Sequence, residues 1–416
     1  MSVATAPGLI ELDETTARAT AAAFDINKLD RSFFENPYPV YHALRRFDPA
    51  HRNGDGTWFI ARYDDALTCY RDRRMSSDKT VEFRPKMGDG PLYLHHTTSL
   101  VFNDPPLHTR VRKLLAAAFT PRAIAAMEPR IVATVDRLLD GMAAKGRVDL
   151  LSDFASSLPL EVVCTMLGVP PDEREPLRAW ATTILSGLEP MLSPQMLDRG
   201  NRAVADFSAY LDRLIEKRRQ RPADDSDILG VLVHGEVDGE KLTHDELVQN
   251  CIFLLNAGHE TTTNLIGNGV DALFRFPGEM DRLRGNPELI ETAIEEMLRF
   301  ESSNQLGNRR VTEAMELGGT SLPAGAYIWI GIGAANHDPA QFHDPDRFDI
   351  ARTPNRHLAF ATGIHACLGM SLARLEGRIA ISHLLARFPK LRRDGAFVRG
   401  GRARFRGFAS YPVAVA

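Results

Sequence analysis

One cysteine, Cys367, lies among residues whose types and spacing suit a metal ligand. Gly363 and Gly369 flank it, and an apolar helical pattern begins at Leu368 and continues through Leu372. Glycine permits close approaches that a side chain would block. A cysteine just before a helix has its sulfur near the positive end of that helix, which favours the thiolate. The segment therefore predicts a thiolate metal ligand, with an inert buried thiol as the alternative.

A second polar segment interrupts the apolar pattern of a long helix. Residues 257–263 read Ala-Gly-His-Glu-Thr-Thr-Thr, although glycine costs about 1 kcal/mol inside a helix and threonine hydroxyls compete for backbone carbonyls. Thr243 and Glu246 have the capping-box spacing that starts this helix, and apolar residues continue to Phe274. The break indicates either a functional site or a polar kink between packed helices.

Other elements must position these two segments. A helix is expected after Asn286, which a proline follows, with apolar residues at helical spacing through Leu298. Strands are expected at residues 58–61 and 327–330, and residues 336–356 are rich in Pro, Asp, His and Asn, which indicates a long ordered loop. We predict a mainly α protein with a small β-rich part.

Composition narrows the class of protein. The 416 residues carry a net charge of −4 with 44% hydrophobic and 25% charged residues, as in ordinary globular proteins, and nothing suggests a nucleic-acid partner. The four cysteines form no C-x-x-C pair, which argues against a zinc ribbon or an iron–sulfur cluster. We expect a loose tail over residues 1–25 and a single domain over 26–416. Without a signal peptide or a membrane-length apolar run, a cytoplasmic protein is expected.

Both polar segments resemble those of the cytochrome P-450 family of haem-thiolate monooxygenases, soluble bacterial type. The family's cysteine loop, F-x-x-G-x-H/R-x-C-x-G, is matched by Phe360, Gly363, His365, Cys367 and Gly369. Its oxygen-binding helix carries A-G-x-D/E-T, matched by Ala257, Gly258, Glu260 and Thr261. Ala361 departs from the pattern, because bacterial members more often have glycine there. The resemblance covers roughly residues 100–376 and implies the P-450 fold, in which the long central helix crosses the core over the haem.

The resemblance also implies roles for individual residues. Cys367 would be the axial ligand of a haem b iron, with Ala257 and Gly258 leaving room for O2. Thr261 and Glu260 would donate and relay protons during O2 activation. The haem propionates would be held by His108, Arg112, His357 and Arg309, with Arg310 as the alternative to Arg309. Glu296, Arg299 and Arg347 would form one buried network that supports core stability and haem incorporation.

Substrate and partners are less closely specified. Mobile segments over the haem are expected to supply a largely apolar pocket for a small lipophilic or aromatic molecule, with contacts from Asn256, Ala257, Gln305, Leu306, Phe83, Leu94 and Phe408. Residues 301–304 lack a proline that is common there in the family, which leaves the pocket shape open.

Too few residues follow Cys367 for a flavin or iron–sulfur domain, so electrons from NAD(P)H are expected through a ferredoxin and its reductase. A basic docking patch for that donor could include Arg71, Arg73, Arg74, Arg110, Arg112 and Lys113. A monomer is expected. The alternatives are a peroxide-driven or non-oxidative haem-thiolate enzyme, and a haem-thiolate sensor or carrier without turnover.

Overall fold

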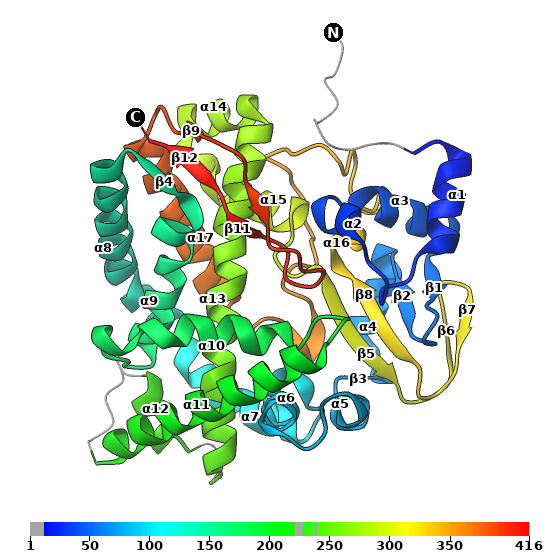
Figure 1. The fold of residues 1–416 in the computed structure, drawn as a ribbon, viewed down its shortest axis with the longest axis horizontal. Helices are drawn as coiled ribbons and strands as arrows, with labels where there is room; N and C mark the ends of the chain where they lie inside the picture. The colour runs from blue at the N-terminus through cyan, green and yellow to red at the C-terminus, as the bar shows by residue number, and fades with distance from the viewer. Residues whose placement is uncertain (1–11, 221–227, 237–238, 416) are drawn as a thin grey trace.

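A single long helix, α13 (His244–Arg275), runs through the middle of the molecule (Figure 1). The predicted capping box is confirmed: the Thr243 hydroxyl accepts from the Glu246 backbone N–H at 3.2 Å, and the Glu246 carboxylate accepts from the Thr243 N–H at 2.8 Å. Most residues of α13 are buried, because it contacts α9, α10, α11, α15 and α17, whose bounds follow. A helix that is covered on several sides must be apolar around most of its circumference.

The computed structural model describes residues 12–220, 228–236 and 239–415. The other α-helices in this part of the chain are α1 (Glu14–Ala23), α2 (Arg31–Glu35), α3 (Tyr38–Phe47), α4 (Tyr63–Arg71), α5 (Thr80–Met87), α6 (Pro91–Thr98), α7 (Leu107–Ala116), α8 (Pro121–Lys145), α9 (Ser157–Met166), α10 (Glu175–Ser186), α11 (Pro194–Arg219), α12 (Ile228–His234), α14 (Pro277–Gly285), α15 (Ile290–Phe300), α16 (Ile332–Ala335) and α17 (Met370–Arg387). None of the described helices is long and apolar enough to cross a membrane.

The strands gather mainly on one side of the helical part (Figure 1). A five-stranded sheet has the order β1-β2-β8-β5-β3, in which β2 and β8 are parallel and the other neighbours antiparallel. Smaller sheets pair β6 with β7, β10 with β11, and β12 with both β4 and β9. The strands are β1 (Ala50–Arg52), β2 (Trp58–Ile60), β3 (Met75–Ser76), β4 (Arg147–Asp149), β5 (Leu306–Val311), β6 (Met315–Leu317), β7 (Thr320–Leu322), β8 (Tyr327–Gly331), β9 (Arg392–Arg393), β10 (Val398–Arg399), β11 (Phe408–Ser410) and β12 (Pro412–Ala414).

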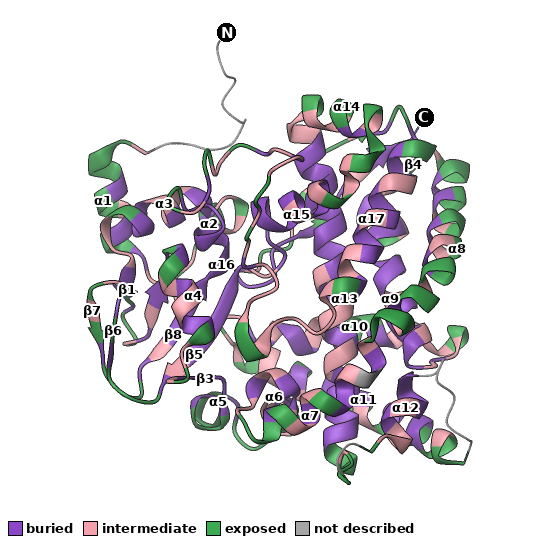
Figure 2. Cartoon of the chain, turned by 180° about the vertical axis from the view of Figure 1, so that it is seen from behind, coloured by how far each residue is buried: buried purple, intermediate pink, exposed green. Residues whose placement is uncertain are grey.

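Burial follows this arrangement. Figure 2 shows α13 and α17 largely buried, whereas α8 on the outside presents an exposed face. The helical elements share one large hydrophobic cluster, and the sheet side contributes two smaller ones. The mainly α prediction with a small β-rich part is confirmed.

Two local predictions differ from the structure in detail. The helix expected after Asn286 starts with the 3-10 turn η5 (Pro287–Leu289) before α15, and Asn286 makes no side-chain cap. The strands expected at 58–61 and 327–330 are present as β2 and β8, and residues 336–362 contain no helix or strand. The loose tail is wrong for residues 14–23, because α1 packs on α3 through the buried Ala17 and Ala21. Residues 1–11 lie outside the described part.

Candidate functional site

The loop that carries Cys367 is held in shape by its own backbone and by α4. The Cys367 N–H donates to the Phe360 carbonyl at 2.9 Å, which closes the loop on itself. Gly363 has φ +73°, and a Cβ there would lie 2.5 Å from the Tyr70 carbonyl oxygen. Only glycine meets both conditions. Ala361 also has a positive φ, 52°, which is the conformation that glycine adopts at lower cost.

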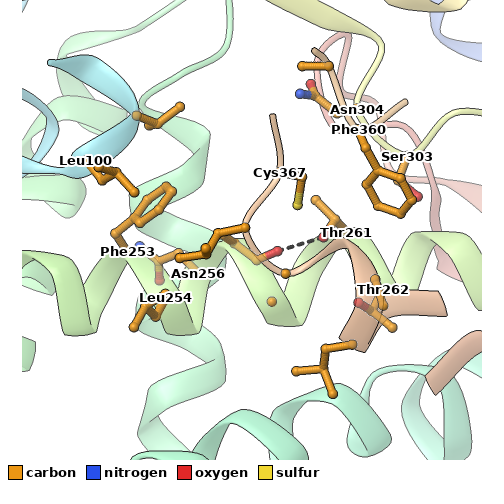
Figure 3. A pocket seen from close by; sticks show the side chains of 18 of the residues that line it. Leu100, Phe253, Leu254, Asn256, Thr261, Thr262, Ser303, Asn304, Phe360 and Cys367 are labelled. Atoms are coloured by element: carbon orange, nitrogen blue, oxygen red, sulfur yellow. Dashed lines mark hydrogen bonds between the residues drawn. The ribbon is translucent and has the colours of Figure 1, made fainter. Parts of the chain in front are cut away.

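Cys367 is the thiol that faces an internal cavity. The cavity has a volume of about 280 Å³ and lies between α13 and the cysteine loop. Figure 3 shows the sulfur directed toward the face of α13 that carries Thr261. Burial raises the pKa of the Cys367 thiol, while the Gly369 N–H and the charges of Arg112 and Arg374 lower it.

The other three cysteines are inert by comparison. Burial raises the pKa of Cys69, Cys164 and Cys251 to about 12, and none of them lines the cavity. A thiol that faces a cavity with two cations and a backbone N–H nearby can become a ligand thiolate.

Most residues predicted from the two motifs meet at this cavity. Its lining includes the predicted residues Cys367, Phe360, His365, Gly369, His108, Arg112, Asn256, Ala257, Gly258 and Thr261. Gly363 lies behind the loop, against α4. The sequence motifs, although more than a hundred residues apart, therefore build opposite walls of one space.

A group of basic side chains without counter-charges lies beside the cysteine loop. The His108 ring is 4.1 Å from the His365 ring, and both His108 nitrogens are buried without a hydrogen-bond partner. Burial and the neighbouring guanidinium groups lower the pKa of His108 to about 4 and that of His365 to about 2. Among the described residues, His108, Arg112 and Arg309 form no ion pair within 4.0 Å. Such a cluster is costly unless an anion binds it.

The direction of side chains on strand β5 distinguishes Arg309 from Arg310 as a candidate for binding an anion. Arg309 is buried and its guanidinium lies 5.2 Å from the centre of the Tyr70 ring, whereas Arg310 is partly exposed. Because neighbouring strand residues point to opposite faces, only Arg309 points to the side of His108 and His365, whose pKa values its charge lowers. Arg309 is therefore the better candidate for an anion site.

His357 belongs to a different cluster. Its Nε2 lies 3.2 Å from the Glu295 carboxylate, which also binds Arg374 at 2.7 Å. Its Nδ1 accepts from the Ala359 N–H at 3.2 Å, and the ring does not line the cavity. Both ring nitrogens of His357 are thus engaged by the protein.

The polar break in α13 has two distinct causes. Gly258 is required for packing, because a Cβ there would lie 2.7 Å from Val163 of α9. The Thr261 hydroxyl donates to the Ala257 carbonyl at 2.6 Å, and Thr263 donates likewise to His259 at 2.9 Å. Each of these threonines thus gives its hydroxyl hydrogen bond to the backbone carbonyl four residues earlier.

Glu260 does not line the cavity. Its carboxylate pairs with Arg402, in the segment between β10 and β11, and both side chains are largely buried. Two residues further along, Arg404 and Phe405 do line the cavity. The acid on α13 and one wall of the cavity are therefore connected through the segment 402–405.

The buried ion network differs from the prediction in one member. Glu296 and Arg299 are fully buried and bidentate, with two contacts of 2.7 Å. The third cation is Arg352, whose Nε lies 3.1 Å from both Glu296 oxygens. The Arg347 side chain is 60% exposed and 4.0 Å from Asp349, so its predicted place in the network is wrong. Only its carbonyl takes part, accepting from Arg299 and Arg352.

Of the residues predicted to contact a substrate, only the two on α13 line the cavity. Asn256 and Ala257 line the cavity, but Gln305 and Leu306 lie behind it, where Gln305 donates to the Ser302 carbonyl. The remaining three do not line it either: Phe83 packs edge-on against His96 and Phe102, Leu94 is exposed, and Phe408 packs on Phe397 and Tyr411. The lining residues that the sequence did not indicate include Val101, Phe253, Leu254, Arg404 and Phe405.

Comparison with known proteins agrees with the site. The family model for cytochrome P450 matches residues 72–391. The chain is 40% identical to the vitamin D(3) 25-hydroxylase of Pseudonocardia autotrophica, over 86% of this chain and 88% of that one, and 38% identical to the cytochrome P450 monooxygenase PikC of Streptomyces venezuelae, over 95% of each. The crystal structure of P450BioI in complex with an acyl carrier protein ligated to hexadec-9Z-enoic acid superposes with a TM-score of 0.88 at 36% identity, covering 92% of this chain and all of that one.

Proposed function

Because the chain belongs to the cytochrome P450 family of monooxygenases, we propose that it inserts one oxygen atom of O2 into a lipophilic organic molecule that binds in the cavity over Cys367. The single observation that carries the proposal is the Cys367 thiol, which faces that cavity opposite Thr261. The chain from α1 onward would act as one domain and as a monomer.

The residues around the cavity fit the haem that the family uses. Cys367 would hold the iron through its sulfur, and the two propionates would be held by His108, Arg112 and Arg309, which form no ion pair in the described part of the chain. The buried ring nitrogens of His108 have no protein partner, which fits this role, because a propionate would accept a hydrogen bond from the ring. When bound, the haem supplies the chemistry of O2 activation and oxygen transfer.

The chain's own groups control protons and water at this site. The Thr261 hydroxyl, now donating to Ala257, can turn toward the cavity and donate a proton there. Glu260 would bring protons to Thr261 from the Arg402 side of α13. Apolar residues such as Leu100, Phe253 and Leu254 exclude bulk water from the same space.

The lining indicates a substrate that is mostly apolar but carries a hydrogen-bonding group. Asn256 is fully buried and neither atom of its amide has a partner, while Arg404 has two unpartnered nitrogens and also lines the cavity. A buried polar group without a hydrogen-bond partner costs about 1–3 kcal/mol. A substrate that forms a hydrogen bond with such a group should therefore bind preferentially. The P450BioI structure holds a long-chain fatty acyl group, and we propose an extended lipophilic substrate of comparable polarity here.

Electrons would arrive from a ferredoxin with its NAD(P)H-dependent reductase, at the surface next to the cysteine loop. Arg71 and Arg73 are exposed there, since Arg71 follows the Tyr70 carbonyl that Gly363 contacts, and Ile364 on the loop is 54% exposed. Arg110 and Arg74 are less suitable, because Glu246 and Asp72 already pair with them. Charge reversal at Arg71 should slow reduction by an acidic ferredoxin, and the same change at Arg202 on α11 should not.

The thiol assignment has a direct spectroscopic test. Protein purified with haem, reduced and exposed to carbon monoxide should show the red-shifted Soret band of a thiolate-ligated carbonyl. Cys367→Ser should abolish that band. Cys251→Ala, which removes a buried thiol from α13, is the control and should leave it unchanged. An unaltered band in Cys367→Ser would refute the assignment.

The enzymatic step needs a second test. Compounds that bind should shift the spin state of the ferric haem, and turnover with surrogate ferredoxin and reductase should consume NAD(P)H and yield an oxygenated product. A bound compound without product under these conditions would favour a sensor or carrier. Product from added peroxide alone, with none from the electron-transfer system, would favour a peroxide-driven enzyme.

A further inference from the structure

A group of three potential metal ligands lies outside the cavity. His42 belongs to α3, His337 follows α16, and Asp346 lies in the long loop that precedes the cysteine segment. Their ligand atoms all fall within 4.8 Å of one another. Figure 1 shows α3 and α16 close together, and the two helices are in contact. The proposed monooxygenase function uses none of these three side chains.

Both ring nitrogens of His337 face hydrogen-bond acceptors. Nε2 lies 2.9 Å from the Phe300 carbonyl, and Nδ1 lies 2.8 Å from the Asp346 carboxylate. Both neighbours only accept hydrogen bonds, but a neutral imidazole has a single N–H. The side chain is 1% exposed, so protons alone satisfy both acceptors only when the ring is an imidazolium paired with Asp346. A metal ion bound by Nδ1 and the carboxylate would take the place of the Nδ1 proton, while Nε2–H still donates to Phe300.

This arrangement is one that metal-binding histidines adopt. A ligating imidazole usually donates its second N–H to a backbone carbonyl or a carboxylate, which fixes the ring and its tautomer. Here the Phe300 carbonyl fills that role, and the ring also packs against Tyr38, with ring centres 4.4 Å apart. The orientation of His337 is therefore set by groups that are not ligands.

His42 adds the third atom. Its Nε2 lies 3.2 Å from Oδ1 of Asp346 but is buried without a hydrogen-bond partner, so the two atoms are close without being aligned as donor and acceptor. Ligand atoms around a tetrahedral zinc ion with bonds of about 2.0 Å lie about 3.3 Å apart. The His42–Asp346 separation already has that value, and the His337–Asp346 separation needs to lengthen by a few tenths of an ångström.

We propose that His42 Nε2, His337 Nδ1 and Asp346 Oδ1 bind a divalent zinc ion, with water as the fourth ligand. Two imidazoles and one carboxylate suit zinc and its probe cobalt better than magnesium or calcium, which prefer oxygen ligands. The side chains of His42 and Asp346 are 30% and 36% exposed, so a metal and its water can enter from solvent.

The charges nearby are compatible with a dication. Arg299 lies close to His337, but the Glu296 carboxylate neutralises it in a bidentate pair. Arg45 contacts Asp338 at 4.0 Å and donates to the Ala334 carbonyl. Asp346 is therefore the carboxylate left for the metal.

The proposed ion would connect α3 to the loop that carries the buried ion network. Arg299 donates to the Pro345 carbonyl at 2.7 Å, and Pro345 adjoins the ligand Asp346. Fixing Asp346 therefore fixes a carbonyl of that network. We expect the metal to stabilise the fold and to leave the haem environment unchanged.

The test uses the haem-loaded, full-length protein after treatment with a chelator and dialysis. Added zinc should bind at one equivalent beyond the haem iron, measured by elemental analysis, and should raise the melting temperature. At free zinc a hundred times the dissociation constant, the ratio of folded to unfolded protein rises about a hundredfold. Cobalt should bind at the same site and give the visible absorption of a four-coordinate ion.

Matched variants separate this site from adventitious surface binding. His42→Gln and Asp346→Asn should each weaken zinc binding by more than the roughly 10- to 100-fold that loss of an outer partner costs. His343→Gln, whose side chain is 93% exposed in the same loop, should bind zinc like the parent. The carbon monoxide spectrum of every variant reports whether it is folded. Absence of zinc binding in the parent, or equal binding in His42→Gln and the parent, would overturn the proposal.

Discussion

Replacement of Arg352 tests which cation completes the buried ion network. Arg352→Gln removes the guanidinium that contacts Glu296, whereas Arg347→Gln changes the residue that the sequence pattern favours. The two arginines lie five positions apart in the same loop. The pair is therefore a matched comparison of one change at a buried and an exposed position.

The structure indicates how much stability each variant should lose. The Arg352 side chain is 11% exposed, and besides Glu296 it donates to the His343, Asp344 and Arg347 carbonyls at 2.7, 3.1 and 3.0 Å. A hydrogen bond to a charged group contributes about 1.5–3 kcal/mol, and breaking a buried ion pair costs about 3–5 kcal/mol. Because Arg299 and Asn355 still bind Glu296, we expect Arg352→Gln to cost about 3 kcal/mol. For Arg347→Gln we expect a change within about 0.5 kcal/mol.

Urea unfolding of the haem-loaded proteins, followed by far-ultraviolet circular dichroism, measures the difference. Haem content after purification measures whether the network also supports haem incorporation, and only Arg352→Gln should lower it. If Arg347→Gln loses as much stability as Arg352→Gln, or if Arg352→Gln unfolds like the parent, the assignment is incorrect.

Three further predictions follow from local geometry. Ala361→Gly should stabilise the protein by about 0.5–1 kcal/mol in urea unfolding, because glycine relieves the positive φ; a loss of stability would contradict this. Gly258→Ala should destabilise it by about 1–3 kcal/mol, since the new Cβ would meet Val163, and Val163→Ala in the same chain should recover part of the loss. Thr261→Ala should keep the thiolate spectrum but divert electrons from product to hydrogen peroxide, whereas Thr261→Ser should not; unchanged coupling in Thr261→Ala would argue against its proton role.

Short-range patterns in the sequence were sufficient to predict the main elements and the two motif segments. The capping box at Thr243 depends on residues three apart. The glycine at position 363 is required by a local positive φ and by one close contact. The same holds for the strands β2 and β8. Such features depend on residues close together in the chain, so they can be predicted directly from the sequence.

Other parts of the site depend on contacts that no local pattern encodes. Arg347 and Arg352 are equivalent as loop arginines, and only the path of the loop turns Arg352 toward Glu296. Leu306 was expected in the pocket, but β5 directs it into the cluster around α3. Helix α1 is only weakly amphipathic, so its local sequence does not predict it. It is held in the fold by packing on α3.

The segment 402–405 touches both the cavity and the acid on α13. Its backbone is held by Glu189, which accepts from the Ala403 and Arg404 N–H groups at 2.9 and 3.0 Å. Arg404 and Phe405 line the cavity, and Arg402, two residues before Arg404, pairs with Glu260. One wall of the cavity and the ion pair of Glu260 thus belong to the same short segment, which Glu189 anchors.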